Sequence, residues 1–95
     1  MKIVLSPRAS GDLERLRTFL SEHGDAVTQR AVTTLRERIA LLAEFPGLGK
    51  PFGQRNLREL YVPFGSSAYV IRYYVSRKRD AVVLLRIWHG RESRR

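Results

Sequence analysis

Five residues near the carboxyl end of the chain have side chains suited to binding an anionic partner: Arg72, Arg86, Trp88, His89 and Arg91. A guanidinium presents a planar fork of donors that fits a carboxylate or a phosphate. An indole can stack on a base or insert into a groove. A histidine can gain or lose a proton near neutral pH. The set predicts a binding surface and supplies candidate groups for acid–base chemistry.

Structural explanations compete with these roles. A histidine at the end of a strand can serve as a hydrogen-bonded structural residue, and an indole can close the rim of a small core. Three arginines on neighbouring strands would repel one another, which favours partner binding for that cluster. Residues 77–79, all basic, are best explained as a solvated turn. We expect removal of the clustered arginines to affect binding more than folding.

The charge of the chain is concentrated in its last quarter. Residues 72–95 hold eight Arg and Lys against two Asp and Glu, whereas residues 1–71 hold ten against seven. Residues 72–95 therefore contribute +6 and residues 1–71 contribute +3 to the total net charge of +9. A field of this sign and density favours nucleic acid or an acidic protein as the partner.

Ninety-five residues predict one domain, 1–95. The absence of cysteine excludes disulfides and thiolate chemistry and is typical of a reducing cytoplasm. No run reaches the roughly 18 apolar residues of a membrane helix, so we expect a cytoplasmic protein without a membrane partner. His23 and His89 are the two histidines and have no carboxylate pair beside them, so no metal and no cofactor is expected.

The first half of the chain predicts a short strand followed by two helices. Residues 2–5 are apolar, and Ser6 and Pro7 then form a helix start, with a hydroxyl N-cap and proline at the first position. Apolar residues recur at helical spacing up to Leu20, and Gly24 is interpreted as a C-cap. Asp25 is interpreted as the N-cap of a second amphipathic helix, so the two should form an antiparallel hairpin.

The second half predicts a loop over residues 45–53, rich in proline and glycine, and then strands over 57–62, 67–75 and 81–89. Alternation places Val83, Leu85 and Ile87 on the face toward the helices. The opposite face receives Leu84, Arg86 and Trp88. On the preceding strand Arg72 and Tyr74 share one face, while Ile71 and Tyr73 share the other. The expected fold is α+β, in the order β-α-α-β-β-β, with a helical hairpin on a small, curved, mostly antiparallel sheet.

This order, the loop Pro46-Gly-Leu-Gly-Lys-Pro51, the strand Tyr69-Val-Ile-Arg-Tyr73 and the ending Trp88-His-Gly-Arg91 together resemble the RelE/ParE toxin superfamily. The likeness runs from Ile3 to Arg91. It implies the toxin of a type II toxin–antitoxin system, neutralised by a cognate antitoxin that is ParD-like or related. RelE-like members cleave messenger RNA on the ribosome, and ParE-like members poison DNA gyrase.

Residue chemistry favours the ParE-like branch. RNA cleavage needs a general base, a cation for the phosphorane and an acid for the leaving oxygen. The resemblance places a RelE-like arginine just after Tyr69, where this chain has Val70. If the protein is nevertheless a nuclease, the candidates are Arg72, His89 and Arg91. A third hypothesis is a non-toxic, basic module that binds nucleic acid.

The resemblance also implies an apolar groove for an antitoxin segment. Candidate contacts are Phe19 and Leu20, as less buried residues of the hairpin, and Tyr61 and Tyr74 as aromatic residues of the sheet. The antitoxin segment should be acidic or amphipathic and fold on binding.

Overall fold

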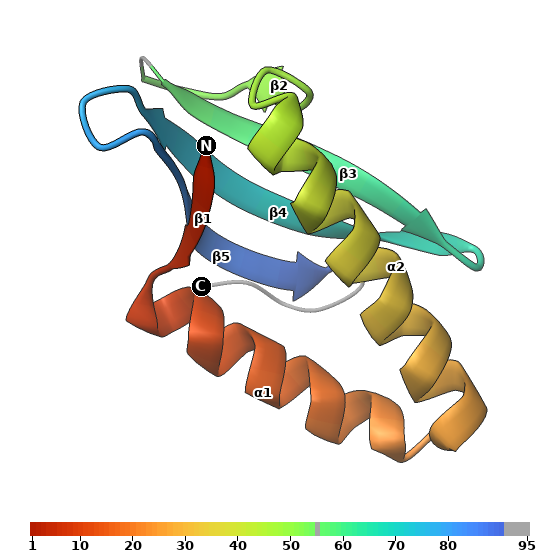
Figure 1. Cartoon of the computed structure of the whole chain (residues 1–95). Helices are drawn as coiled ribbons and strands as arrows, with labels where there is room; N and C mark the ends of the chain where they lie inside the picture. The colour runs from red at the N-terminus through yellow and green to blue at the C-terminus, as the bar shows by residue number, and fades with distance from the viewer. Residues whose placement is uncertain (55, 91–95) are drawn as a thin grey trace.

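Two helices cover one face of a five-stranded sheet in this computed structural model, which describes residues 1–54 and 56–90 (Figure 1). The elements in chain order are β1 (Lys2–Leu5), α1 (Pro7–Ser21), α2 (Asp25–Glu44), β2 (Lys50–Pro51), β3 (Leu57–Phe64), β4 (Ser67–Ser76) and β5 (Ala81–His89). The predicted order is confirmed. The one addition is β2, a two-residue strand inside the segment that the sequence predicts to be a loop.

The strands follow the order β1-β5-β4-β3-β2 across the sheet. β1 lies parallel to β5, with Lys2 opposite Ala81 and Leu5 opposite Leu84. The other three pairings are antiparallel, so the mostly antiparallel sheet is confirmed. Because β1 ends opposite Leu84, no strand of the described residues lies beside the rest of β5 on that edge.

The start of α1 is fixed by Ser6. Its hydroxyl accepts a hydrogen bond from the Ala9 backbone nitrogen at 3.0 Å, which satisfies one of the free N–H groups of the first turn. The same hydroxyl donates to the carbonyl oxygen of Leu85 at 3.1 Å. The predicted N-cap therefore also attaches the helix to β5.

The connection between the helices differs from the prediction in detail. Glu22 is the C-cap of α1, and Gly24, with φ of 102°, is the N-cap of α2. Asp25, predicted as that N-cap, is instead the first helical residue. A backbone with positive φ suits glycine, and the carbonyl of Gly24 accepts the Thr28 N–H at 3.2 Å. Gly24 thus provides the positive φ at the point where the chain turns from α1 into α2.

The core lies between the helices and the sheet. From the helices it receives the predicted apolar stripe, and from the strands one alternating face. Its fully buried members include Ala9, Leu16, Ala31, Leu42, Val62, Ile71, Tyr73, Val82, Leu84 and Ile87. Burial of this apolar area is the main force that holds the helices to the sheet.

The faces predicted for the first half of β5 are wrong, because the strand contains a β-bulge. Arg72 of β4 lies opposite Arg86, but Tyr73 lies opposite Leu84, so Leu85 has no partner residue. Before the bulge Leu84, not Val83 or Leu85, packs into the core. After it, Ile87 faces the helices, as predicted. One extra residue inverts the alternation, and two consecutive leucines conceal it in the sequence.

The loop after α2 is tied to the sheet through Tyr73. The buried Tyr73 hydroxyl donates to the Pro46 carbonyl and accepts from the Gly49 nitrogen, both at 2.8 Å. Burial raises the pKa of this hydroxyl, against the opposing effects of the Gly49 N–H and of Arg58. The Arg58 guanidinium in turn donates to the carbonyl of Gly49 at 2.6 Å.

No helix among the described residues is long and apolar enough to cross a membrane.

Candidate functional site

Two of the predicted arginines face each other on neighbouring strands. Arg72 on β4 and Arg86 on β5 are register partners, so the sheet brings them together as the sequence predicts. The expected repulsion between them is relieved, because each guanidinium is bound by a different carboxylate of the chain.

Arg72 is held by Glu59, its register partner on β3. Its Nε and Nη2 donate to Glu59 Oε2 at 2.8 and 2.6 Å. Its guanidinium carbon also lies 4.2 Å from the ring centre of Phe52 and 5.0 Å from that of Trp88. These are cation–π distances. The side chain is thus bound between two aromatic rings and an acid that is only 7% exposed.

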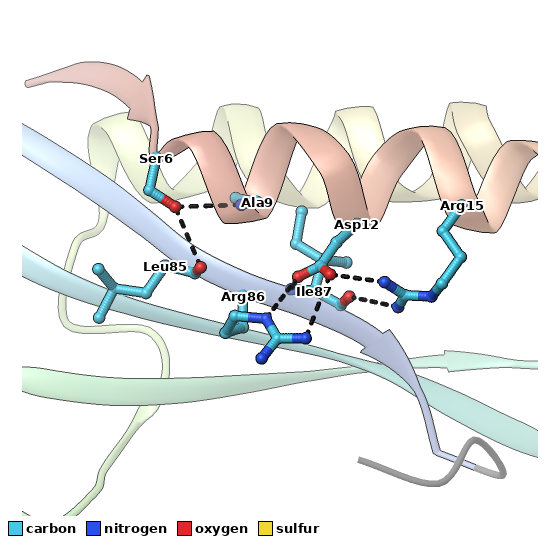
Figure 2. Close-up of polar contacts among 7 residues, drawn as sticks. All are labelled: Ser6, Ala9, Asp12, Arg15, Leu85, Arg86 and Ile87. Atoms are coloured by element: carbon cyan, nitrogen blue, oxygen red, sulfur yellow. Dashed lines mark hydrogen bonds and ion pairs between the residues drawn. The ribbon is translucent and has the colours of Figure 1, made fainter. Parts of the chain in front are cut away.

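Arg86 is held by Asp12 of α1 (Figure 2). Asp12 is buried, and its Oδ2 accepts from Arg86 Nε at 2.9 Å and from the Ile87 backbone nitrogen at 2.7 Å. Arg15, one turn later on α1, donates to Asp12 Oδ1 at 2.6 Å and to the Ile87 carbonyl oxygen at 3.2 Å. Two side chains of α1 therefore satisfy both backbone groups of Ile87, where the neighbouring strand has ended.

These hydrogen bonds determine the protonation of Asp12. Burial acts to raise the pKa of this carboxyl, but hydrogen bonds from Arg86, Ile87 and Arg15 outweigh it and hold the pKa below its ordinary value. Asp12 is therefore an anion at neutral pH, and the cluster is an ionic contact between helix and sheet.

Trp88 and His89 occupy the end of β5. The Trp88 side chain is 6% exposed and lies opposite Val70, on the face away from the helices. The half-buried His89 ring meets the Tyr69 ring edge-on, with 5.2 Å between their centres. Trp88 and Arg72 thus share one face of the sheet, while His89 lies against Tyr69, a residue of the core.

An apolar hollow lies beside His89, between the ends of the helices and the sheet. It is lined by Phe19, Leu20, His23, Val27, Phe64, Tyr69 and His89. A second apolar groove runs between the two helices and is lined by Leu13, Leu16, Arg17, Leu20, Val32, Leu35, Arg36 and Ile39. Both histidines of the chain line the first hollow, and two arginines line the second.

The predicted antitoxin contacts lie on two sides of the molecule. Phe19 is 44% exposed on α1 and Tyr61 is 53% exposed on β3. The expectation that Leu20 is one of the less buried hairpin residues is wrong, because it is 6% exposed and belongs to the core. It nevertheless forms part of the wall of both hollows. Tyr61 and the half-buried Tyr74 lie on the sheet face opposite the helices.

Arg91 was predicted to complete the cluster, but it lies outside the described residues. The set Arg72, Arg86 and Trp88 is gathered on β4 and β5, and His89 follows at the strand end. Among residues 1–54 and 56–90, no three His, Asp or Glu side chains gather in a way that could hold a metal ion.

Sequence reasoning missed Asp12 and Glu59, the two acids that are buried among residues 1–54 and 56–90. One signal for Asp12 was present: it falls on the apolar stripe of α1, three residues after Ala9 and four before Leu16. An acidic residue on a buried stripe requires a cationic partner. Glu59 precedes the core residue Leu60 on β3 and points to the opposite face of the sheet. Nothing in the sequence pattern indicated that it would be buried.

Comparison with known proteins agrees with this fold. Residues 3–94 match the family described as the ParE toxin of the type II toxin–antitoxin system, parDE. Two curated proteins of Caulobacter vibrioides, Toxin RelE3 and Toxin RelE1, are 41% and 38% identical over 92 residues. These alignments cover 97% of this chain, and 97% and 96% of the respective relatives.

Solved structures with low sequence identity share the fold. A chromosomal ParDE system from P. aeruginosa matches with a TM-score of 0.71 at 20% identity, over 94% of this chain and 95% of that one. The isolated E. coli RelE toxin matches with a TM-score of 0.68 at 18% identity, over 97% and 86%. The sequence match over nearly the whole chain, on this fold, shows that the protein belongs to the ParE toxin family of type II toxin–antitoxin systems.

Proposed function

We propose that this toxin arrests growth by inhibiting DNA gyrase, as a ParE-like toxin, and not by cutting RNA. The observation that carries the proposal is that both arginines of the sheet already bind carboxylates of the same chain. Arg72 is paired with Glu59 and Arg86 with Asp12. A guanidinium that already binds a carboxylate has fewer donors left for the charge that develops on a phosphorane.

The position after Tyr69 supports the same conclusion. The family resemblance places a nuclease arginine there, and this chain has Val70, which is 4% exposed and packed opposite Trp88. An apolar, buried side chain can neither donate a proton nor stabilise a phosphate.

The second candidate function is ribosome-dependent cleavage of messenger RNA. His89 favours it, because an imidazole at the end of a strand can act as a general acid or base. The name RelE of the Caulobacter relatives is consistent with it. In that case Arg72, His89 and the undescribed Arg91 remain the candidate catalytic residues, and Arg72 would contact RNA through the donors that Glu59 does not bind.

Two assays with the purified toxin separate these functions. One follows supercoiling of relaxed plasmid by gyrase, and the other maps cleavage of messenger RNA on ribosomes by primer extension. Toxin already bound to its antitoxin is the control in both. We expect supercoiling to fall and the messenger RNA to stay intact. Normal supercoiling together with cuts at defined codon positions would overturn the proposal.

The antitoxin is proposed to bind along the helical hairpin and to place an apolar side chain in the hollow beside Phe19. The hollow is apolar, and Phe19 at its edge is 44% exposed. The interhelical groove continues it through Leu20, with Arg17 and Arg36 among its lining residues. Acidic side chains next to the apolar anchors would pair with these arginines. Tyr61 and Tyr74 are accessible only to a segment that also reaches the other face.

A further inference from the structure

The turn between β4 and β5 lies at the end of the sheet away from His89 and takes no part in the functions above. Around it gather six basic residues from four elements or turns, here called the turn-end surface: Lys2, Lys50, Arg58, Arg77, Lys78 and Arg79. We propose that the turn-end surface binds the phosphate backbone of double-stranded DNA.

Backbone pairing brings these residues to the half of the sheet that ends at this turn. The Lys2 nitrogen donates to the carbonyl of Asp80 in the turn, at 3.1 Å. On the other side the Val75 nitrogen donates to the carbonyl of Asn56 at 3.1 Å, two residues before Arg58. Arg58 lies opposite Tyr73, three residues before the end of β4, and Lys50 of β2 pairs with Glu59, the residue after Arg58. The basic residues therefore belong to adjacent strands and to the turn between β4 and β5, and not to one flexible run.

The charge of the surface is mostly uncompensated. Five of its six residues are exposed, all except the half-buried Arg58. Among the described residues, backbone hydrogen bonds bring two unpaired acids to this region: Asp80, whose carbonyl accepts from the Lys2 nitrogen, and Glu44, next to the Ala43 carbonyl that binds the amino terminus. Glu59 is already paired with Arg72. Six cations against these two acids leave a balance of +4.

A polar hollow of about 260 Å³ lies within this surface. Arg58 and Arg77 line it together with Gln54 and Asn56. Arg58 is positioned by the loop, since its guanidinium donates to the carbonyl of Gly49. The hollow offers guanidinium and amide donors to a phosphate group, while Lys78 and Arg79 stand in the adjacent turn.

The width of the surface favours a duplex. Lys2 is on β1 and Lys50 on β2, the two outer strands of the sheet. Four strand spacings of about 4.8 Å separate these strands by roughly 19 Å. Over that length a DNA duplex carries about eleven phosphate charges, at one per roughly 1.7 Å of its axis. Several cations can then contact phosphates at the same time.

A single strand fits less well. Proteins that bind single strands combine basic residues with aromatic side chains on which the bases stack. None of the six residues is aromatic, and Phe52, two residues after Lys50, has a face of its ring covered by Arg72 at 4.2 Å. The choice of DNA over RNA rests on the proposed function, because gyrase acts on duplex DNA.

Fluorescence anisotropy with a labelled 20-base-pair DNA duplex, measured over a range of salt concentrations, tests the proposal. The test variant is Lys78→Ala with Arg79→Ala. Each lost phosphate contact should lower the slope of log affinity against log salt by about 0.9. We expect the double variant to lose up to about 1.8 in slope and at least tenfold in affinity at low salt, with an unchanged thermal midpoint.

The control is Arg8→Ala with Arg30→Ala, two exposed helix residues outside the turn-end surface, whose removal changes net charge equally. An equal loss in the control would show that only net charge matters and that residues 77–79 form a solvated turn. Equal or tighter binding of the single strand, or tighter binding of an RNA duplex of the same sequence, would also overturn the proposal. Because the assay contains only toxin and nucleic acid, its result does not depend on gyrase inhibition.

Discussion

Asp12 Oδ2 accepts the backbone N–H of Ile87 at 2.7 Å, across 75 positions of sequence. The contact lies where β1 has ended and where, within residues 1–54 and 56–90, no other strand borders β5 on that edge. Asp12 and Arg15 supply the acceptor and the donor that an adjacent strand would provide. The helix thereby covers this part of the sheet edge, and an uncovered edge is a site for pairing with another chain.

Asp12→Asn is expected to destabilise the fold by about 2–4 kcal/mol, because it leaves Arg86 partly buried without a counter-ion. For a domain of this size that lowers the thermal midpoint by roughly 8–32 °C. Thermal unfolding followed by circular dichroism measures it. Glu14→Gln, at an exposed position of the same helix, is the control. Equal midpoints for the two variants would show that the buried pair contributes nothing.

The stability contributed by Asp12 should disappear in acid. Its pKa is lowered in the folded state, so the unfolded chain takes up the proton first as the pH falls. The contribution is fully present above the unfolded pKa of about 3.9 and is lost as the pH falls through the folded value. Urea unfolding from pH 7 to pH 2 should show the difference between wild type and Asp12→Asn shrinking below about pH 4. A difference that stays constant would contradict this assignment.

The loop after α2 provides a steric test. A Cβ at Gly49 would lie 2.7 Å from the Tyr73 hydroxyl oxygen and 2.8 Å from the Glu59 carbonyl oxygen. A Cβ at Gly47 would have nothing within 4 Å. Gly49→Ala is therefore expected to cost about 1–3 kcal/mol in denaturant unfolding, and Gly47→Ala much less. Similar costs for both would mean that the loop moves freely away from Tyr73.

Sequence patterns predicted the elements well because each depends on neighbouring residues. Ser6 and Pro7 mark a helix start, and the spacing from Ala9 to Leu20 marks its buried face. The bulge at Leu85 could not be predicted, because two consecutive leucines fit either face. The pairing of Asp12 with Arg86 depends on how α1 lies along β5, which local patterns do not determine. Arginines that looked like free binding groups are therefore partly structural, and their removal should affect folding as well.

Antitoxin binding should depend on Phe19. Phe19→Asp places a negative charge at the edge of the apolar hollow and would repel an acidic antitoxin segment. We expect the affinity to fall about 10- to 100-fold, or about 1.4–2.8 kcal/mol, with little change in stability because Phe19 is 44% exposed. Calorimetric titration with the protein encoded by the neighbouring reading frame measures it. Thr18→Asp, at the adjacent exposed position, is the matched control. Equal affinities would place the antitoxin elsewhere, with Tyr61 and Tyr74 the next candidates.

The last prediction distinguishes the aromatic packing of the His89 side chain from the chemistry of its ring nitrogens. His89→Phe keeps an aromatic ring against Tyr69, whose centre lies 5.2 Å away, but removes every group that can exchange a proton or hydrogen-bond a target. We expect the thermal midpoint to change by only a few degrees, since an aromatic pair is worth about 0.5–1.5 kcal/mol. Toxicity should fall at least tenfold, measured as colony survival after induction. His23→Phe, in the same hollow but contributed by the turn after α1 and not by the end of β5, should remain toxic. A His89→Phe variant as toxic as wild type would exclude the imidazole from target engagement and leave the face bearing Arg72 and Trp88 as the remaining candidate surface.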